Sequence, residues 1–192
     1  MGTVPYKPTF EPAKFKELML YAAEKSLNDP TFGATKLNKI LFFSDFLCFG
    51  LAGHAITGAT YQRLKNGPAP IQLLAMEREI EAAQEGYFVL RPYFNLKQKR
   101  LVAARPANPQ RFSSEELDLI NDVITNLEAY NASDVSNLSH IRSRAWQIAE
   151  EGEEIPYSAV FLSSRKATPS DIQRGRDLAR QYGWLDSGKS GR

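Results

Sequence analysis

The residues between Thr35 and Gly50 constrain the fold more than any other part of this chain. With Thr35 as the cap and Gly50 as the terminator, this segment is predicted to be a helix that runs to about Phe49. Apolar side chains occur on nearly every side of that helix: Leu37, Ile40, Leu41, Phe42, Phe43, Phe46 and Leu47. Such a helix is stable only in the middle of a core. The 192 residues, 43% of them apolar, are enough for one domain around it.

Other segments have the one-sided apolar pattern of helices that pack on a core. The first is predicted from Pro12 to Leu27 and the strongest from about Ser114 to Tyr130, where Ser113 and Glu116 form a capping box. The inward residues predicted for the two helices are Phe15, Leu18, Met19, Ala22, Ala23, Leu117, Ile120, Val123, Ile124 and Leu127.

A third helix is predicted over about Ala69 to Glu85, with Gly86 as its cap. Its predicted inward residues are Ile71, Leu74, Ala75 and Ile80. Shorter helical segments are predicted at about 132–139 and 140–150, and a last helix starts at Thr168-Pro169 and ends before Gly183.

β-Branched and aromatic residues predict a short strand within 55–65, which is followed by a turn at 66–70. Two further strands, 87–90 and 101–104, are predicted with a basic connection between them. The expected fold is therefore mainly α (α+β), a helical domain with a small β-hairpin element, loosely like a winged helix. We expect a single domain with a core at 10–160, a helical extension at 161–186 and a flexible tail at 187–192.

Charge is unevenly distributed although the net charge is only +2. The segment from Arg91 to Arg111 has six basic residues and no acid, whereas the segment from Glu115 to Glu154 has ten acids. The basic segment is either a solvated hairpin or a surface that meets an acidic partner. A nucleic acid is the weaker candidate, because the predicted third helix carries Glu77, Glu79, Glu81 and Glu85 against Arg78, and phosphates would repel it.

The residues that could support catalysis are few. Ser44, Asp45 and His140 could be assembled into a triad, but the chain has no nucleophile elbow. His140 is better explained as a half-buried residue that packs beside Trp146. Cys48 is the only cysteine, no Cys/His cluster indicates a metal site, and no cofactor motif occurs. Lys36 and Lys39 are lysines of the kind that extend from a buried helix.

Three motifs, in order along the chain, resemble the Panacea domain of SocA-like antitoxins. The first is Lys36-Leu37-Asn38-Lys39-Ile40-Leu41-Phe42-Phe43-Ser44-Asp45. The second is Ile56-Thr57-Gly58-Ala59-Thr60-Tyr61, followed by Asn66-Gly67-Pro68-Ala69-Pro70. The third comprises Leu138-Ser139-His140, Ala145-Trp146 and Ile155-Pro156-Tyr157.

The resemblance implies an antitoxin of a bacterial or phage toxin–antitoxin system, which is not an enzyme and neutralises a cognate toxin by direct binding. Two alternatives remain: an adaptor that delivers a toxin to a AAA+ protease, and a nucleic-acid-binding regulator. Family specificity is expected outside the motifs, so the motif residues are predicted to be scaffold: Lys36, Leu37, Leu41, Asp45, Gly67, Pro68, His140 and Trp146.

The toxin-binding surface is predicted on the basic hairpin, with a second group near the Gly-Pro motif. The residues predicted to contact the toxin are Tyr61, Arg63, Lys65, Arg91, Lys97, Lys99 and Arg100. Changing Lys97, Lys99 and Arg100 to Glu is expected to weaken neutralisation without unfolding the protein. The sequence predicts no signal peptide, no membrane segment and no cofactor, and therefore a cytoplasmic protein.

Overall fold

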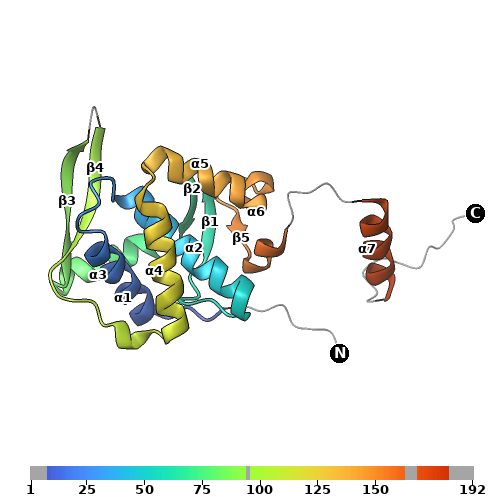
Figure 1. Ribbon diagram of the computed structural model, residues 1–192, viewed down its shortest axis with the longest axis horizontal. Coiled ribbons are helices and arrows are strands. Elements are labelled where there is room, and N and C mark those ends of the chain that lie inside the picture. The colour runs from blue at the N-terminus through green and yellow to red at the C-terminus, as the bar shows by residue number, and fades with distance from the viewer. Residues whose placement is uncertain (1–7, 94–95, 163–167, 182–192) are drawn as a thin grey trace, which may run out of the picture. The chain divides into compact units, whose positions relative to one another are not determined.

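A computed structural model of the chain describes residues 8–93, 96–162 and 168–181. Residues 8–162 form one compact unit, and α7 (Pro169–Gln181) belongs to a second unit. The order of elements confirms a mainly helical fold with small antiparallel sheets (Figure 1). The predicted tail at 187–192 lies outside the described residues.

The apolar helix α2 (Ala34–Ala52) lies within the core, as its sequence predicts. It packs against α1 (Pro12–Lys25), α4 (Ser114–Glu128), α5 (Ala132–Arg142) and the 3-10 turn η2 (Tyr157–Phe161). Burial of Leu37, Ile40 and Leu41 is essentially complete. An aromatic cluster continues the core toward η2, where the rings of Phe46 and Tyr157 stack with centroids 4.7 Å apart.

Both predicted ends of α2 require correction. The N-cap is Gly33 rather than Thr35, and the helix continues through Gly50 to end before Gly53. Gly53 adopts φ +77°, and its N–H donates to the carbonyl of Phe49, which is the left-handed cap that glycine favours. Gly50 has another role, because a Cβ there would lie 3.2 Å from Val160, so glycine lets η2 approach α2 closely.

The segment predicted as a turn at 66–70 is largely a strand. β1 (Tyr61–Leu64) pairs with β2 (Gly67–Pro70) across the short connection at 65–66, and β5 (Glu154–Ile155) lies on the other side of β1. β2 is an edge strand, which is where a sheet tolerates prolines that cannot donate a hydrogen bond. All four residues of β2 are nevertheless buried, and α2 and α5 pack against this strand.

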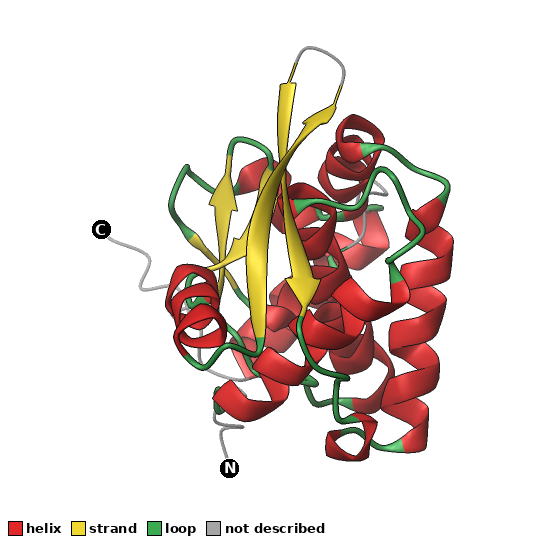
Figure 2. Ribbon diagram, turned by 90° about the vertical axis from the view of Figure 1, so that its left-hand side faces the viewer, coloured by secondary structure: helices red, strands yellow, loops and turns green. Residues whose placement is uncertain are grey.

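The second sheet is a long hairpin, β3 (Gly86–Tyr93) and β4 (Leu96–Ala103), so the predicted basic connection lies mostly within the strands. In Figure 2 the hairpin runs along the helices, and the ends of its two strands near residues 93 and 96 extend beyond them. α3 (Leu73–Ala82) is shorter than predicted, and it buries Met76, Glu77 and Ile80 while Leu74 is exposed. The predicted buried face of α3 is wrong, because Glu77 lies on the buried side of the helix, where it forms an ion pair with Lys99. Gly86 begins β3 instead of capping α3.

The later helices follow their sequence signals more closely. α4 starts at the predicted capping box, in which the Ser113 hydroxyl accepts from the Glu116 N–H and the Glu116 carboxylate accepts from the Ser113 N–H. α5 is followed by α6 (Arg144–Ile148), and a 3-10 turn η1 (Pro109–Arg111) precedes α4. Within the described residues, no helix combines the length and hydropathy needed to cross a membrane.

A Gly67→Ala substitution is expected to lower the free energy of unfolding by about 3 kcal/mol, from backbone strain plus a steric clash. Gly67 has φ +98°, and a Cβ there would lie 2.6 Å from Ser139 Oγ and 2.7 Å from Lys39 Nζ. Gly152 is the matched control, because it has φ +85° with no atom within 4 Å of an added Cβ. Urea unfolding of Gly152→Ala should give a loss of only about 1 kcal/mol. Equal losses for the two variants would contradict the close approach at Gly67.

Candidate partner-binding surface

The carboxylate of Asp45 joins α2 to the start of the small sheet. It accepts hydrogen bonds from the Thr57 N–H and hydroxyl, both at 2.6 Å, and from the Tyr61 hydroxyl at 2.8 Å. Burial raises the pKa of Asp45, although these hydrogen bonds oppose the rise. Tyr61 has no exposed surface. Its predicted contact with a toxin is therefore wrong, because its ring and hydroxyl are both used inside the fold.

Two lysines of α2 are also buried. Lys36 Nζ lies 2.7 Å from Asp29 Oδ2, and it also donates to Thr31 and to the carbonyl of Glu128. Lys39 Nζ donates to the carbonyl of Pro68 at 2.9 Å, directly beside Gly67. Burial lowers the pKa of Lys39 to about 7. Both lysines therefore connect α2 to neighbouring segments, and neither extends to the surface.

His140 and Trp146 form a stack beside the β1–β2 connection. Their ring centroids are 3.6 Å apart and their planes differ by 8°, which confirms the predicted packing. Trp146 Nε1 donates to the backbone carbonyl of Leu64. The Arg63 guanidinium lies 4.8 Å from the centroid of the Trp146 ring, and its Nε donates to the backbone carbonyl of Trp146. Burial, with the nearby charges of Lys39 and Arg63, lowers the pKa of His140. Arg63 thus has a structural partner, whereas Lys65 is exposed.

Arg100 anchors the long hairpin to the connection between α1 and α2. Its guanidinium donates to four backbone carbonyls, those of Ser26, Leu27, Asp29 and Phe32. Only 3% of Arg100 is exposed. The predicted contact role of Arg100 is therefore wrong, and a triple substitution that includes Arg100→Glu would place a carboxylate against four carbonyl oxygens.

Lys99, the residue before Arg100 on β4, connects the hairpin to α3. Lys99 forms an ion pair with the buried Glu77, and its Nζ lies 4.2 Å from the centroid of the Phe88 ring. Lys99 is part-buried, so much of its charge is already neutralised. The predicted basic surface is consequently smaller than the sequence implies.

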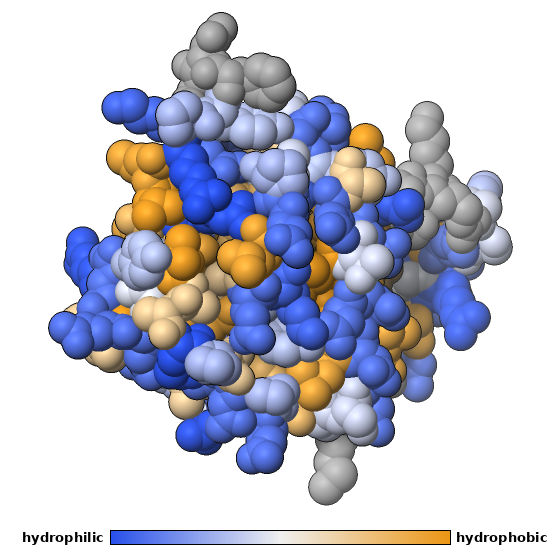
Figure 3. All heavy atoms as spheres, turned by 60° about the vertical axis from the view of Figure 1, so that its left-hand side comes forward, coloured by the Kyte–Doolittle hydropathy of each residue, from blue (hydrophilic) through white to orange (hydrophobic). Residues whose placement is uncertain are grey.

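The outer part of the hairpin remains as an exposed basic and apolar area. Arg91 and Lys97 are exposed, and neither forms an ion pair within the described parts of the chain. Leu90 and Tyr87 on β3 are 66% and 50% exposed. Figure 3 brings the side that carries β3 and β4 forward, and on that face apolar side chains lie among hydrophilic ones. The pairing register places Tyr87 and Arg91 on one face of the two-stranded sheet and Leu90 and Lys97 on the other. We call these four residues, which lie on both faces of the outer hairpin, the hairpin surface.

An apolar groove of about 630 Å³ lies between α2, α4, α5 and η2. Its walls include Phe43, Leu47, Leu127 and Val160, with Arg142 among the polar residues that line it. No local sequence pattern predicts this groove, because its walls come from four separate segments.

The side chains suggested for catalysis do not form a triad. The Asp45 carboxylate accepts hydrogen bonds from Thr57 and Tyr61. Neither Ser44 Oγ, which is fully buried, nor His140 Nε2 has a hydrogen-bond partner among the described residues. Ser44, Asp45 and His140 therefore lack the hydrogen bonds that would make Ser44 a nucleophile.

Comparison with protein families gives a match to the antitoxin SocA-like, Panacea domain over residues 37–147, more than half of the chain. The chain belongs to this family. No curated protein and no solved structure matches it.

The matched region of this Panacea domain contains most of the scaffold residues described above. It begins at Leu37 and includes Asp45, Gly67 and Trp146 as well as the whole long hairpin. Membership supports a regulatory role in a toxin–antitoxin system and a toxin as the general type of partner. The predicted scaffold residues Leu37, Leu41 and Pro68 are buried, as packing residues should be.

The stability of this Panacea domain should depend on pH through Lys39. The pKa of Lys39 is about 7 in the folded state, against an ordinary value of 10.5. Between those values the unfolded chain binds more protons, so the free energy of unfolding rises with pH, by up to about 1.4 kcal/mol per unit. Urea titrations at pH 7 to 9 should therefore show a steeper rise for wild type than for Lys39→Met. If the free energy of unfolding had the same slope against pH in both proteins, the lowered pKa of Lys39 would be contradicted.

Arg100→Met should destabilise the domain by about 3 kcal/mol, because four buried carbonyls lose a charged donor. Arg91→Met, on the same hairpin, is the matched control and should change the free energy of unfolding by less than about 0.5 kcal/mol. Denaturant titrations of both variants measure the difference. A small effect of Arg100→Met would mean that this anchor does not hold the hairpin.

Proposed function

We propose that this Panacea-domain protein neutralises a cognate toxin by binding it directly through the hairpin surface, in the cytoplasm of a bacterium or as part of a phage-encoded pair. The observation that carries the proposal is membership of the SocA-like antitoxin family, which makes a toxin the expected partner. The choice of surface is a further step, and it rests on exposure, charge and rigidity.

Rigidity favours the hairpin as the binding element. Arg100 fixes one side of β4 to the α1–α2 connection, and Lys99 fixes the other side to α3. A surface that is already ordered loses little conformational freedom when a partner binds.

Composition also favours the hairpin surface. Protein interfaces are enriched in aromatic residues and arginine, and Tyr87 and Arg91, which share one face of the hairpin, are of these two kinds. Arg91 and Lys97 would steer an acidic face of the toxin toward the hairpin and fix its orientation.

The function is tested by expressing the gene adjacent to this one, alone and together with this protein. If the neighbour stops growth and co-expression restores it, the antitoxin function stands. Continued growth arrest on co-expression, with both proteins present at measurable levels, would overturn it. The half-life of the toxin separates the two modes of action: a stable toxin supports neutralisation by binding, and protease-dependent loss supports the adaptor.

Arg91→Glu together with Lys97→Glu should weaken toxin binding by about tenfold or more, because a cation on each face of the hairpin becomes an anion that repels an acidic partner in contact with both faces. Neither side chain contributes an anchor to the fold, so the free energy of unfolding should stay near that of wild type. Calorimetric titration with the purified toxin measures the affinity. The loss of affinity relative to wild type should be larger at low salt concentration than at high salt concentration.

Arg111→Glu together with Arg144→Glu is the control, since both residues are exposed, lie outside the hairpin and give the same change in net charge. This control should bind the toxin like wild type. If the two double variants lost toxin affinity equally, the effect would be one of net charge and not of the hairpin surface. Full binding by the hairpin variant would reject the hairpin surface while leaving the antitoxin function intact.

A further inference from the structure

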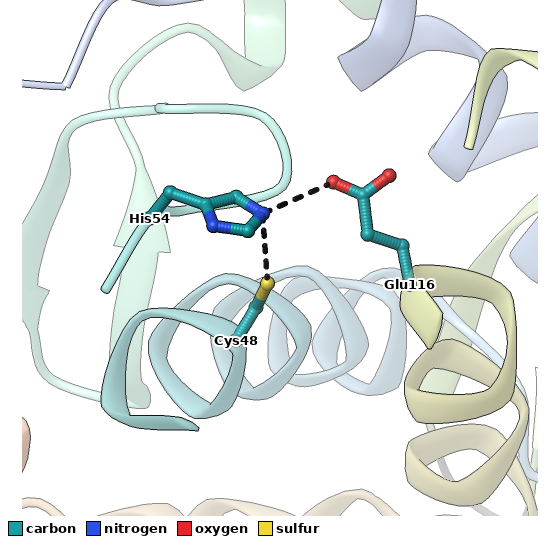
Figure 4. Close-up of side chains that lie close together, drawn as sticks. All are labelled: Cys48, His54 and Glu116. Atoms are coloured by element: carbon teal, nitrogen blue, oxygen red, sulfur yellow. Dashed lines mark hydrogen bonds and ion pairs between the residues drawn. The ribbon is translucent and has the colours of Figure 1, made fainter. Parts of the chain in front are cut away.

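Three metal-ligating side chains meet at the C-terminal end of α2 (Figure 4). Cys48 lies on α2, His54 follows the end of that helix, and Glu116 lies in the first turn of α4. Cys48 Sγ is 3.8 Å from His54 Nε2, and the same nitrogen is 3.7 Å from Glu116 Oε1. All three atoms lie within 4.8 Å of one another.

The backbone fixes where these side chains meet. The left-handed conformation of Gly53 turns the chain back after α2, and His54 then lies beside the last turns of the helix, over Cys48. The capping box fixes Glu116, because its Oε2 accepts from the Ser113 N–H. The other oxygen, Oε1, is directed toward His54.

The same geometry argues against a catalytic triad. In a triad the two imidazole nitrogens face different partners, whereas Cys48 and Glu116 both approach Nε2 of His54. Cys48 and Glu116 therefore converge on one nitrogen of His54, as the ligands of a shared ion would.

We propose that Cys48, His54 and Glu116 bind one divalent ion of the zinc class. A thiolate, an imidazole and a carboxylate are all zinc ligands, with bonds of about 2.0–2.3 Å. In a tetrahedron these bonds place neighbouring ligand atoms about 3.3–3.6 Å apart. The two separations of 3.7 and 3.8 Å need to shorten by only a few tenths of an ångström.

Charge and access are compatible with this ion. The thiolate and the carboxylate together balance the two positive charges of a divalent cation, and the thiol proton is released to solvent on binding. More than half of the His54 side chain is exposed, so a water molecule can take the fourth position. Lys14 Nζ now lies 2.7 Å from Glu116 Oε1, and this long side chain must turn toward solvent when the ion binds.

Cobalt(II) is the probe for this site, because a four-coordinate Co²⁺ thiolate complex absorbs in both the ultraviolet and the visible range. The full-length protein, freed of metal with a chelator, is expected to bind one Co²⁺ per chain with a thiolate-to-cobalt band, and added Zn²⁺ should remove that band. Zn²⁺ should also raise the Tm. No thiolate band in the folded protein at stoichiometric Co²⁺ would overturn the proposal.

Substitutions locate the site. His54→Ala should weaken Co²⁺ binding at least tenfold without affecting folding, because His54 is exposed, and Cys48→Ala should abolish the thiolate band. Glu115→Gln is the control, since it removes a neighbouring exposed carboxylate that is not part of the cluster. Equal Co²⁺ affinity in wild type and His54→Ala would place the ion elsewhere and reject the site. The outcome does not depend on the antitoxin function, which has its own growth assay.

Discussion

The polar side chains buried on α2 hold the surrounding elements in place. An apolar helix alone could pack in many orientations, because hydrophobic contact is not directional. Lys36, Lys39 and Asp45 remove that freedom, since each forms hydrogen bonds or an ion pair with a different segment: the α1–α2 connection, β2, and the start of β1. Leaving any of these groups unpaired in the interior would cost far more than its hydrogen bond contributes, so the arrangement is specified strongly.

The long hairpin combines an anchored part with an exposed part. Arg100 and Lys99 use their charges inside the molecule, on the carbonyls of the α1–α2 connection and on Glu77. Arg91 and Lys97, toward the tip, have no such partners in the part of the chain that is described. The same basic segment therefore serves two purposes. Its inner residues position the strand, and its outer residues are available to a partner.

Local signals predicted much of the fold, and long-range packing decided the rest. The capping box at Ser113 and the pairing of His140 with Trp146 were correctly inferred, because each depends on residues close together in sequence. The predicted exposure of Arg100 is wrong, because four backbone carbonyls of the α1–α2 connection, which is distant in sequence, surround its guanidinium. The meeting of Cys48 with Glu116 was missed for the same reason: no sequence spacing predicts that α4 begins beside the end of α2.

The central claim, that this Panacea domain binds a toxin through its hairpin, is tested most directly by hydrogen–deuterium exchange on the protein with and without the purified product of the adjacent gene. The account predicts that complex formation slows exchange in β3 and β4 while amides of β1 and β2 exchange as before. Slower exchange confined to the helices around the apolar groove, or no change anywhere at saturating partner, would contradict it.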